Sequence, residues 1–470
     1  MAYNHMIYGH IHPDMGKTTM IDTRIILALA LSTVLIIGFY GSGRRFSSPV
    51  IFFTVPFIIQ AINSLYYPWT IKSTTFFIVI SGSVVFALSC SLVHFMFNHK
   101  QGYKQISIAR SKKALMSNQQ YILLIFLTLL AIVYVYHSIK SLTVSGSINS
   151  DFSDVIGEFN SATKAGNDEY SLPFTTSTIL FALYGASYAY AYIFAASLKR
   201  NGRRNWHLPC ILFVTGILGT FLSGNRTEVL GPIITFILFM LMLNEQSNHH
   251  LSLKNIPIRI YIISIILIIV ILLAAIASTS IFGRDASDNP LDYFSIYVGA
   301  PLQNLDYAVN DLHPSSDHFG VNTFRNIYPF FEKIGLVPEG SSVIRFPFVA
   351  RGIYFTGNVY TIYYALLLDF GFSGCLVAIF IMGAAMQFFY ECAIRRMDID
   401  FIPISCIIYG ALNFYLFMSY FSTNFFQNIF TTGVFKTILG IVTICLYQHI
   451  CNSFIIVPKQ SQQMKDSVYS

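Results

Sequence analysis

The chain alternates long apolar runs with short polar connections. A transmembrane helix needs about 20 mostly apolar residues, and runs of this kind recur along the chain without the period-two polar face of a membrane β-barrel. The pattern therefore predicts an all-α polytopic membrane protein with about eleven spans, within a range of ten to twelve. We expect the spans at residues 25–41, 50–68, 76–97, 121–139, 173–197, 206–222, 228–243, 258–282, 372–391, 402–421 and 433–457.

Two polar segments interrupt this pattern. The larger, residues 284–352, is too long for a simple connection and is rich in Asp, Arg, Asn and Pro, and a shorter one covers residues 140–171. We therefore divide the chain into N-terminal spans (1–283), a large loop (284–352) and C-terminal spans (353–470). Soluble chemistry in such a chain is expected at the large loop.

Composition supports a membrane location and argues against nucleic-acid binding. The chain is 54% hydrophobic and 11% charged, against roughly 25% charged residues in an average soluble protein. The net charge of +7 comes mostly from short basic loops. We interpret it as a sign of topology and of contact with anionic membrane lipids.

The basic loops also predict orientation, because cytoplasmic loops collect Lys and Arg. Residues 98–120 and 198–207 contain several basic residues and no acid, so we place them in the cytoplasm. Alternation of the spans then puts residues 140–171, the large loop 284–352 and the N-terminus on the outer side.

The first candidate site is the turn Ser-Gly-Asn-Arg-Thr-Glu at residues 223–228. The spans that flank it, 206–222 and 228–243, cover only about 25 Å, less than the ~30 Å hydrocarbon core, so we expect the turn to lie below the outer surface. Arg226 would need an anionic partner there, and a lipid-linked phosphate fits. In the alternative, Arg226 reaches lipid headgroups or pairs with Glu228.

The second candidate site is the return of the large loop to the membrane, where arginines precede a group of tyrosines. A helix from about Asn358 would put Tyr360, Tyr363 and Tyr364 on neighbouring positions of one face. Sugar rings stack on aromatic faces and guanidinium groups pair with pyrophosphate, so this order suits a glycolipid. The alternative is an aromatic belt at the membrane interface.

Other polar residues leave alternatives open. Asp369, inside an apolar run, either terminates a helix ahead of Gly371 or is a site acid. We expect no metal site at His313 and His318, because their spacing is not a tight helical pair. A loop acid or His318 would be the general base for a sugar hydroxyl, and the sequence does not select one.

The span 173–197 carries four tyrosines among small residues: Tyr184, Tyr188, Tyr190 and Tyr192. Small residues at four-residue spacing allow helices to approach closely. We therefore expect helix packing, with sugar stacking as the alternative.

Two short stretches, together with the layout of the whole chain, resemble a known family. They are the turn Ser-Gly-Asn-Arg-Thr at residues 223–227 and the run from Arg351 to Gly371, which reads RGIYFTGNVYTIYY and ends in LDFG. Both, and a large outer loop in the second half, resemble the oligosaccharide repeat-unit polymerases (Wzy-type O-antigen polymerases). The chain departs from an Arg-x10-Gly pattern found in outer loops of some members.

The resemblance implies a glycosyltransferase of the GT-C-like, lipid-sugar-using kind in a bacterial inner membrane. It would transfer a growing glycan from undecaprenyl diphosphate to the terminal sugar of a new lipid-linked repeat unit at the periplasmic face, with no cofactor. A chain-length regulator and a flippase of the same pathway are the implied protein partners. An O-antigen ligase or a lipid-linked oligosaccharide flippase is the alternative.

The residues expected to act follow from the two candidate sites. We assign leaving-group stabilisation to Arg226, Arg351 and Arg345. Substrate binding is assigned to Arg284, Arg325, Tyr354, Asn358, Tyr360, Tyr364 and His318.

Overall fold

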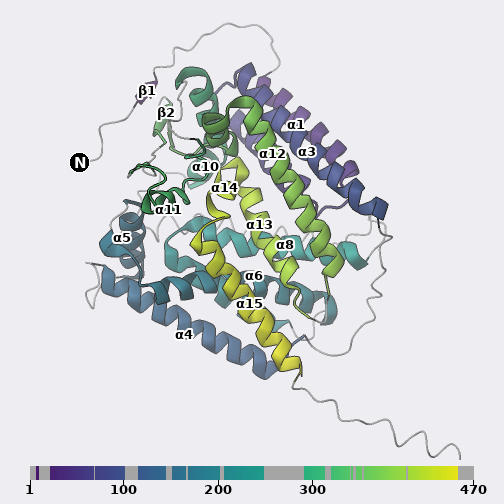
Figure 1. The fold of residues 1–470 in the computed structure, drawn as a ribbon, viewed down its shortest axis with the longest axis vertical. Helices are drawn as coiled ribbons and strands as arrows, with labels where there is room; N and C mark the ends of the chain where they lie inside the picture. The colour runs from purple at the N-terminus through teal and green to yellow at the C-terminus, as the bar shows by residue number, and fades with distance from the viewer. Residues whose placement is uncertain are drawn as a thin grey trace, which may run out of the picture.

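The computed structural model shows a helical bundle with one small sheet (Figure 1). The structure describes residues 7–9, 22–67, 69–100, 115–143, 151–165, 168–201, 206–247, 290–312, 319–338, 340–341, 346–351, 354–398 and 401–453. All long elements in these ranges are α-helices, so the prediction of an all-α polytopic membrane protein is confirmed.

The helices follow the apolar runs. They are α1 (Thr23–Gly41), α2 (Pro49–Asn63), α3 (Ser73–Lys100), α4 (Asn118–Leu142), α5 (Phe152–Ala165), α6 (Phe174–Asn201), α7 (His207–Thr220), α8 (Arg226–Ser247), α10 (Pro290–Tyr307), α11 (Tyr328–Lys333), α12 (Ile362–Arg396), α13 (Ile404–Phe417), α14 (Asn424–Asn428) and α15 (Thr432–Ser453). Within the described ranges, 8 helices are long and apolar enough to cross a membrane, and α7 and α13 are shorter apolar helices. The expected span 258–282 lies outside the described residues.

The turn at residues 223–228 joins one short helix to one long one. Helix α7 has 14 residues, whereas the apolar part of α8, Thr227–Gln246, has 20. The prediction of two short spans is therefore wrong for the second. The polar end of α8 stays helical because its side chains find partners inside the protein: Glu245 accepts a 3.0 Å hydrogen bond from the Ser47 N–H, and Gln246 donates one of 3.0 Å to the Met397 carbonyl.

The helix after the large loop begins later than expected. It starts at Ile362 and not near Asn358, because Gly357 has a left-handed φ of 75° and the backbone from there to Thr361 is non-helical. Gly371, with φ 65° and ψ −173°, then interrupts α12 and produces a kink between two helical halves. The apolar pattern could not show that both halves continue as one element.

The bundle is organised around α6. In its membrane-spanning window 78% of the residues are buried, against 22% for α1 and α4, whose apolar side chains face outward. Glycines allow the close approach of α6 to α15: a Cβ at Gly185 would collide with the Thr437 carbonyl, and one at Gly440 with the backbone of Ala182. The small residues of this span therefore serve helix packing, as expected.

The segments expected on the outer side lie together, and we call this side of the molecule the loop end. It contains α5 and the turn 223–228, which are in contact, and the described loop residues 319–338. A three-stranded sheet belongs to it: β1 (Ile7–Gly9) pairs in parallel with β2 (Val349–Arg351), which pairs antiparallel with β3 (Tyr354–Gly357). The N-terminal strand thus lies beside a strand of the large loop.

Hydrogen bonds to buried polar side chains hold the loop end in place. Asn304 of α10 donates to the carbonyls of Thr356 (3.2 Å) and Val359 (2.9 Å), which fixes the chain between β3 and α12. Asp369 accepts hydrogen bonds from Asn322 Nδ2 (2.8 Å) and from the Thr323 N–H (2.6 Å). Asp369 therefore anchors the loop to α12; it does not terminate the helix ahead of Gly371, as one of its predicted alternatives had it, because α12 continues past the kink.

The helix ends beside the predicted cytoplasmic loops meet at a different place, which we call the basic end. Here Arg395 Nη2 donates a 3.3 Å hydrogen bond to the Phe97 carbonyl, and His94 Nδ1 lies 2.6 Å from Glu391 Oε1. These contacts join the ends of α3 and α12 that precede two of the predicted cytoplasmic loops.

Candidate functional site

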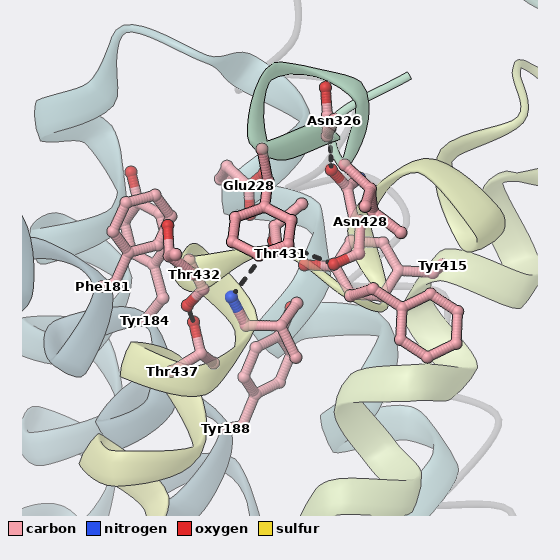
Figure 2. A pocket seen from close by; sticks show the side chains of 15 residues that line it. Phe181, Tyr184, Tyr188, Glu228, Asn326, Tyr415, Asn428, Thr431, Thr432 and Thr437 are labelled. Carbon is pink, nitrogen blue, oxygen red and sulfur yellow. Dashed lines mark hydrogen bonds between the residues drawn. The ribbon is translucent and has the colours of Figure 1, made fainter. Parts of the chain in front are cut away.

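A cavity of about 520 Å³ lies at the loop end (Figure 2). Its walls come from α6, α8, α13, the α14–α15 corner and the turn before α11. The volume falls in the range of small-molecule sites, about 300–1,000 Å³. Segments from both halves of the chain therefore build one site, and part of the large loop covers it.

Aromatic rings form much of the wall. Phe181, Tyr184 and Tyr188 follow one face of α6, because residues three and four positions apart are neighbours on a helix, and Tyr415 of α13 adds a fourth ring. Phe330 and Phe430 complete the lining and are 59% and 58% exposed. Such flat apolar faces suit the C–H faces of sugar rings.

Amide and hydroxyl groups line the side of the cavity near the loop. Asn326 Nδ2 donates a 3.2 Å hydrogen bond to Asn428 Oδ1, and Thr431 Oγ1 donates one of 2.9 Å to the Asn428 carbonyl. These contacts join the large loop to the α14–α15 corner. They also leave amide edges beside the cavity, where the hydroxyl groups of a sugar would find partners.

Glu228 is the single acid in the cavity lining. It is half-buried, and its carboxylate has no hydrogen bond or ion pair with any residue that the structure describes. Tyr184, Tyr188 and Tyr415 line the same cavity. A carboxylate in an aromatic pocket is thus available to a ligand.

The turn before α8 fixes the position of this acid. Gly224 has a left-handed φ of 66° and packs against Asn160 of α5, where a Cβ would clash. Asn225 Oδ1 accepts a 2.8 Å hydrogen bond from Thr227 Oγ1. Arg226 is the first residue of α8, two positions before Glu228, so the first predicted site lies at the edge of the cavity.

The other predicted arginines fall in different places. Arg325 directly precedes the lining residue Asn326, and Arg351 lies in β2, opposite Tyr354 of β3. Arg284 and Arg345 lie outside the described residues, as does His318. Arg226 and Arg325 therefore lie within two positions of a lining residue along the chain, whereas Arg351 belongs to the sheet.

The tyrosines of the second predicted site pack against each other. The rings of Tyr360 and Tyr364 stack with centroids 4.2 Å apart, and each residue is 2% exposed. The Tyr360 hydroxyl donates a 2.9 Å hydrogen bond to the Pro347 carbonyl, and Tyr363 is fully buried. None of the three lines the described cavity, and Asn358 is exposed beyond β3.

Other polar residues of the large loop have structural contacts. Burial and the nearby Asp369 carboxylate raise the pKa of Tyr328, whose hydroxyl donates to the Phe319 carbonyl. Asp311 forms an ion pair of 2.7 Å with Lys72, while His313 lies outside the described residues. The described part of the chain contains no group of three or more His, Cys, Asp or Glu residues that would hold a metal.

Sequence reasoning did not select most of the residues that line this cavity, and it weighed two of them mainly as packing residues. Glu228 entered only as a partner for Arg226, and Tyr415 was not singled out, although a tyrosine in a short apolar span is a usable signal. Tyr184 and Tyr188 were expected to serve packing first. Tyr184 and Tyr188 line the cavity. Tyr190 is not among the lining residues, and its hydroxyl forms a 2.9 Å hydrogen bond with Thr128 inside the bundle.

The fold and the cavity define a class: a polytopic helical membrane protein with an aromatic cavity, lined in part by the large loop. A family model described as "O-antigen polysaccharide polymerase Wzy" matches residues 19–295, more than half of the chain. The chain belongs to this family, as the resemblance implied. No curated protein matches the chain, and no solved structure does. The matched region includes the turn 223–228 and all the cavity residues of α6 and α8.

Proposed function

We propose that this protein polymerises lipid-linked oligosaccharide repeat units at the periplasmic face of a bacterial inner membrane. It transfers the growing glycan from undecaprenyl diphosphate to the terminal sugar of a new repeat unit. The observation that carries this proposal is the cavity itself: an aromatic pocket with one acid and two amide side chains, at the loop end of the bundle, in a member of the polymerase family.

The walls of the cavity suit the acceptor sugar. Tyr184, Tyr188 and Tyr415 offer ring faces for stacking, and Asn326 and Asn428 offer amide groups to its hydroxyls. The exposed rings Phe330 and Phe430 flank the rim, where the apolar lipid of the substrate would run into the bilayer.

The leaving diphosphate needs positive charge, because it gains negative charge as the glycosidic bond breaks. A preorganised donor in a pocket sheltered from water stabilises such a group by about 2.7–4 kcal/mol, by analogy with oxyanion holes. We assign this role first to Arg226, at the edge of the cavity, and then to Arg325. Arg284, Arg345 and Arg351 are further candidates from the large loop.

A deletion strain tests the proposal. Loss of a polymerase leaves lipopolysaccharide with a single repeat unit, and the plasmid-borne gene should restore the full ladder of chain lengths. A deletion strain that shows no repeat at all would assign the ligase reaction instead. Accumulation of lipid-linked repeat units on the cytoplasmic side alone would assign a flippase.

A further inference from the structure

The cavity acid, Glu228, differs from the buried acids of the described chain. Glu245 accepts a hydrogen bond from the Ser47 N–H (3.0 Å), Glu391 binds His94 (2.6 Å), and Asp306 accepts one from Thr75 Oγ1 (2.7 Å). Each of these carboxylates joins two helices or a helix and a loop. Glu228 has no such partner among the described residues and faces the cavity.

A carboxylate in this position lowers the stability of the fold unless a ligand binds to it. Partial burial of a carboxylate that has no protein hydrogen bond weakens its hydration and so costs folding free energy. The neighbouring hydroxyl of Tyr184 is buried, and it makes no hydrogen bond of good geometry in the described structure, although the Ser223 side chain lies near it. Glu228 opens onto the cavity without a partner from the described residues, and Tyr184 beside it is only 5% exposed. These two polar groups point to a polar ligand that contacts both.

We infer that Glu228 is the general base of the transfer reaction and that Tyr184 hydrogen-bonds the same acceptor sugar. This inference rests on the proposed function. The acceptor hydroxyl is too weak a nucleophile unless its proton is removed, and a carboxylate within reach supplies that step. Because aromatic rings hold the sugar against the wall, the hydroxyl to be activated would sit beside Glu228 (Figure 2).

The reaction balances without a further reactant. The acceptor hydroxyl oxygen forms a bond to the anomeric carbon of the growing glycan, while the bond from that carbon to the diphosphate oxygen breaks. The proton of the hydroxyl passes to the Glu228 carboxylate, and the electron pair of the broken bond leaves with the diphosphate. Glu228 then releases the proton to water, and the lipid diphosphate departs.

The test uses the purified full-length protein in lipid nanodiscs with lipid-linked repeat units as both donor and acceptor. Glu228→Gln keeps the size of the side chain and removes its basicity. The rate should fall about 10²–10⁴-fold, the range for a positioned general base, while the KM for the lipid-linked unit stays close to the original value. Glu228→Ala with added formate should regain part of the rate, because a small carboxylate fits the vacated space.

The controls separate this inference from the function on which it rests. Glu158→Gln is the matched variant: this residue of α5 also lies at the loop end, accepts a 2.8 Å hydrogen bond from Tyr170 and does not line the cavity, so its rate should be normal. Glu228→Asp keeps a carboxylate and should retain more activity than Glu228→Gln, which a purely structural role would not produce.

Two results would overturn the inference. One is a normal rate for Glu228→Gln in a reaction that the original protein carries out. The other is a loss in Glu228→Ala that formate leaves unchanged, combined with equal losses in the Asp and Gln variants. If the original protein forms no polymer from lipid-linked units, the proposed function itself fails, whatever the variants do.

Discussion

Asn326 of the large loop donates a hydrogen bond of 3.2 Å to Asn428 at the end of α14. Both residues line the cavity, so this contact closes its wall between the loop and the C-terminal helices. The loop is held a second time where Gln427 donates a 3.1 Å hydrogen bond to the Asn322 carbonyl. The large loop is therefore part of the site and not merely a connection above it.

Arg226→Ala should leave the protein inserted and abolish long polymer. Loss of one well-placed charged donor costs about 2.7–4 kcal/mol, or 10²–10³-fold in rate, and repeated transfers multiply the loss. Chain length on lipopolysaccharide gels from a complemented deletion strain measures the effect. Arg396→Ala, an exposed arginine at the end of α12, is the matched control. A full ladder of chain lengths from the Arg226→Ala protein would contradict a role of Arg226 in the reaction.

Asp369→Ala should loosen the loop that covers the cavity. The change leaves the Thr323 N–H and the Asn322 amide without their acceptor, at about 1–3 kcal/mol for each buried unsatisfied group. Hydrogen exchange of residues 319–338 in nanodiscs should accelerate, while exchange in α6 stays unchanged. Loop exchange in Asp369→Asn should be faster than in the original protein and slower than in Asp369→Ala, since the amide side chain keeps one acceptor oxygen. Unchanged exchange in the loop would contradict the anchoring role.

Substitution by alanine should change stability in opposite directions at two helical glycines. Gly185→Ala places a Cβ against the Thr437 carbonyl, and overpacking of this kind costs about 1–3 kcal/mol or more. Gly157→Ala in α5 meets open space and should be neutral or stabilise α5 by roughly 0.5–1 kcal/mol. Thermal unfolding in detergent compares the two. Equal melting temperatures would show that α6 and α15 are not packed as described.

The predicted orientation is open to chemical labelling. Lys333→Cys at the end of α11 should react with a membrane-impermeant maleimide in intact spheroplasts, because it is exposed at the loop end. Arg396→Cys, exposed at the basic end, should react only after lysis. The reverse pattern would place the cavity on the cytoplasmic side and refute a periplasmic reaction.

Hydrophobic periodicity was sufficient for the fold class because the bilayer demands long apolar helices. It could not mark the end of α8, since the polar residues Glu245 and Gln246 are satisfied by partners in distant segments. It also could not place the start of α12, which depends on the left-handed backbone of Gly357. Both errors concern contacts or conformations that a local apolar pattern does not contain.

The candidate site was predictable only in part. The turn around Arg226 stood out because a charged residue between apolar spans needs an anionic partner. Glu228, in the same turn, lines the cavity. Glu228 and Tyr415 meet only through tertiary packing, so no local spacing linked them. Tyr360 and Tyr364 looked like an open aromatic face, yet they stack on each other beside the loop exit. Burial of an aromatic residue near a membrane surface is decided by its neighbours, which the sequence does not reveal.

The central claim is that the polymer is extended in the cavity at the loop end, and filling that cavity tests it most directly. Thr432 is an exposed residue of α15 that lines the cavity, and Thr443 is an exposed residue of the same helix away from it. Thr432→Trp should reduce the lipopolysaccharide of a complemented deletion strain to a single repeat unit, while Thr443→Trp gives the full ladder at the same protein level. A full ladder from a correctly inserted Thr432→Trp protein would contradict the account.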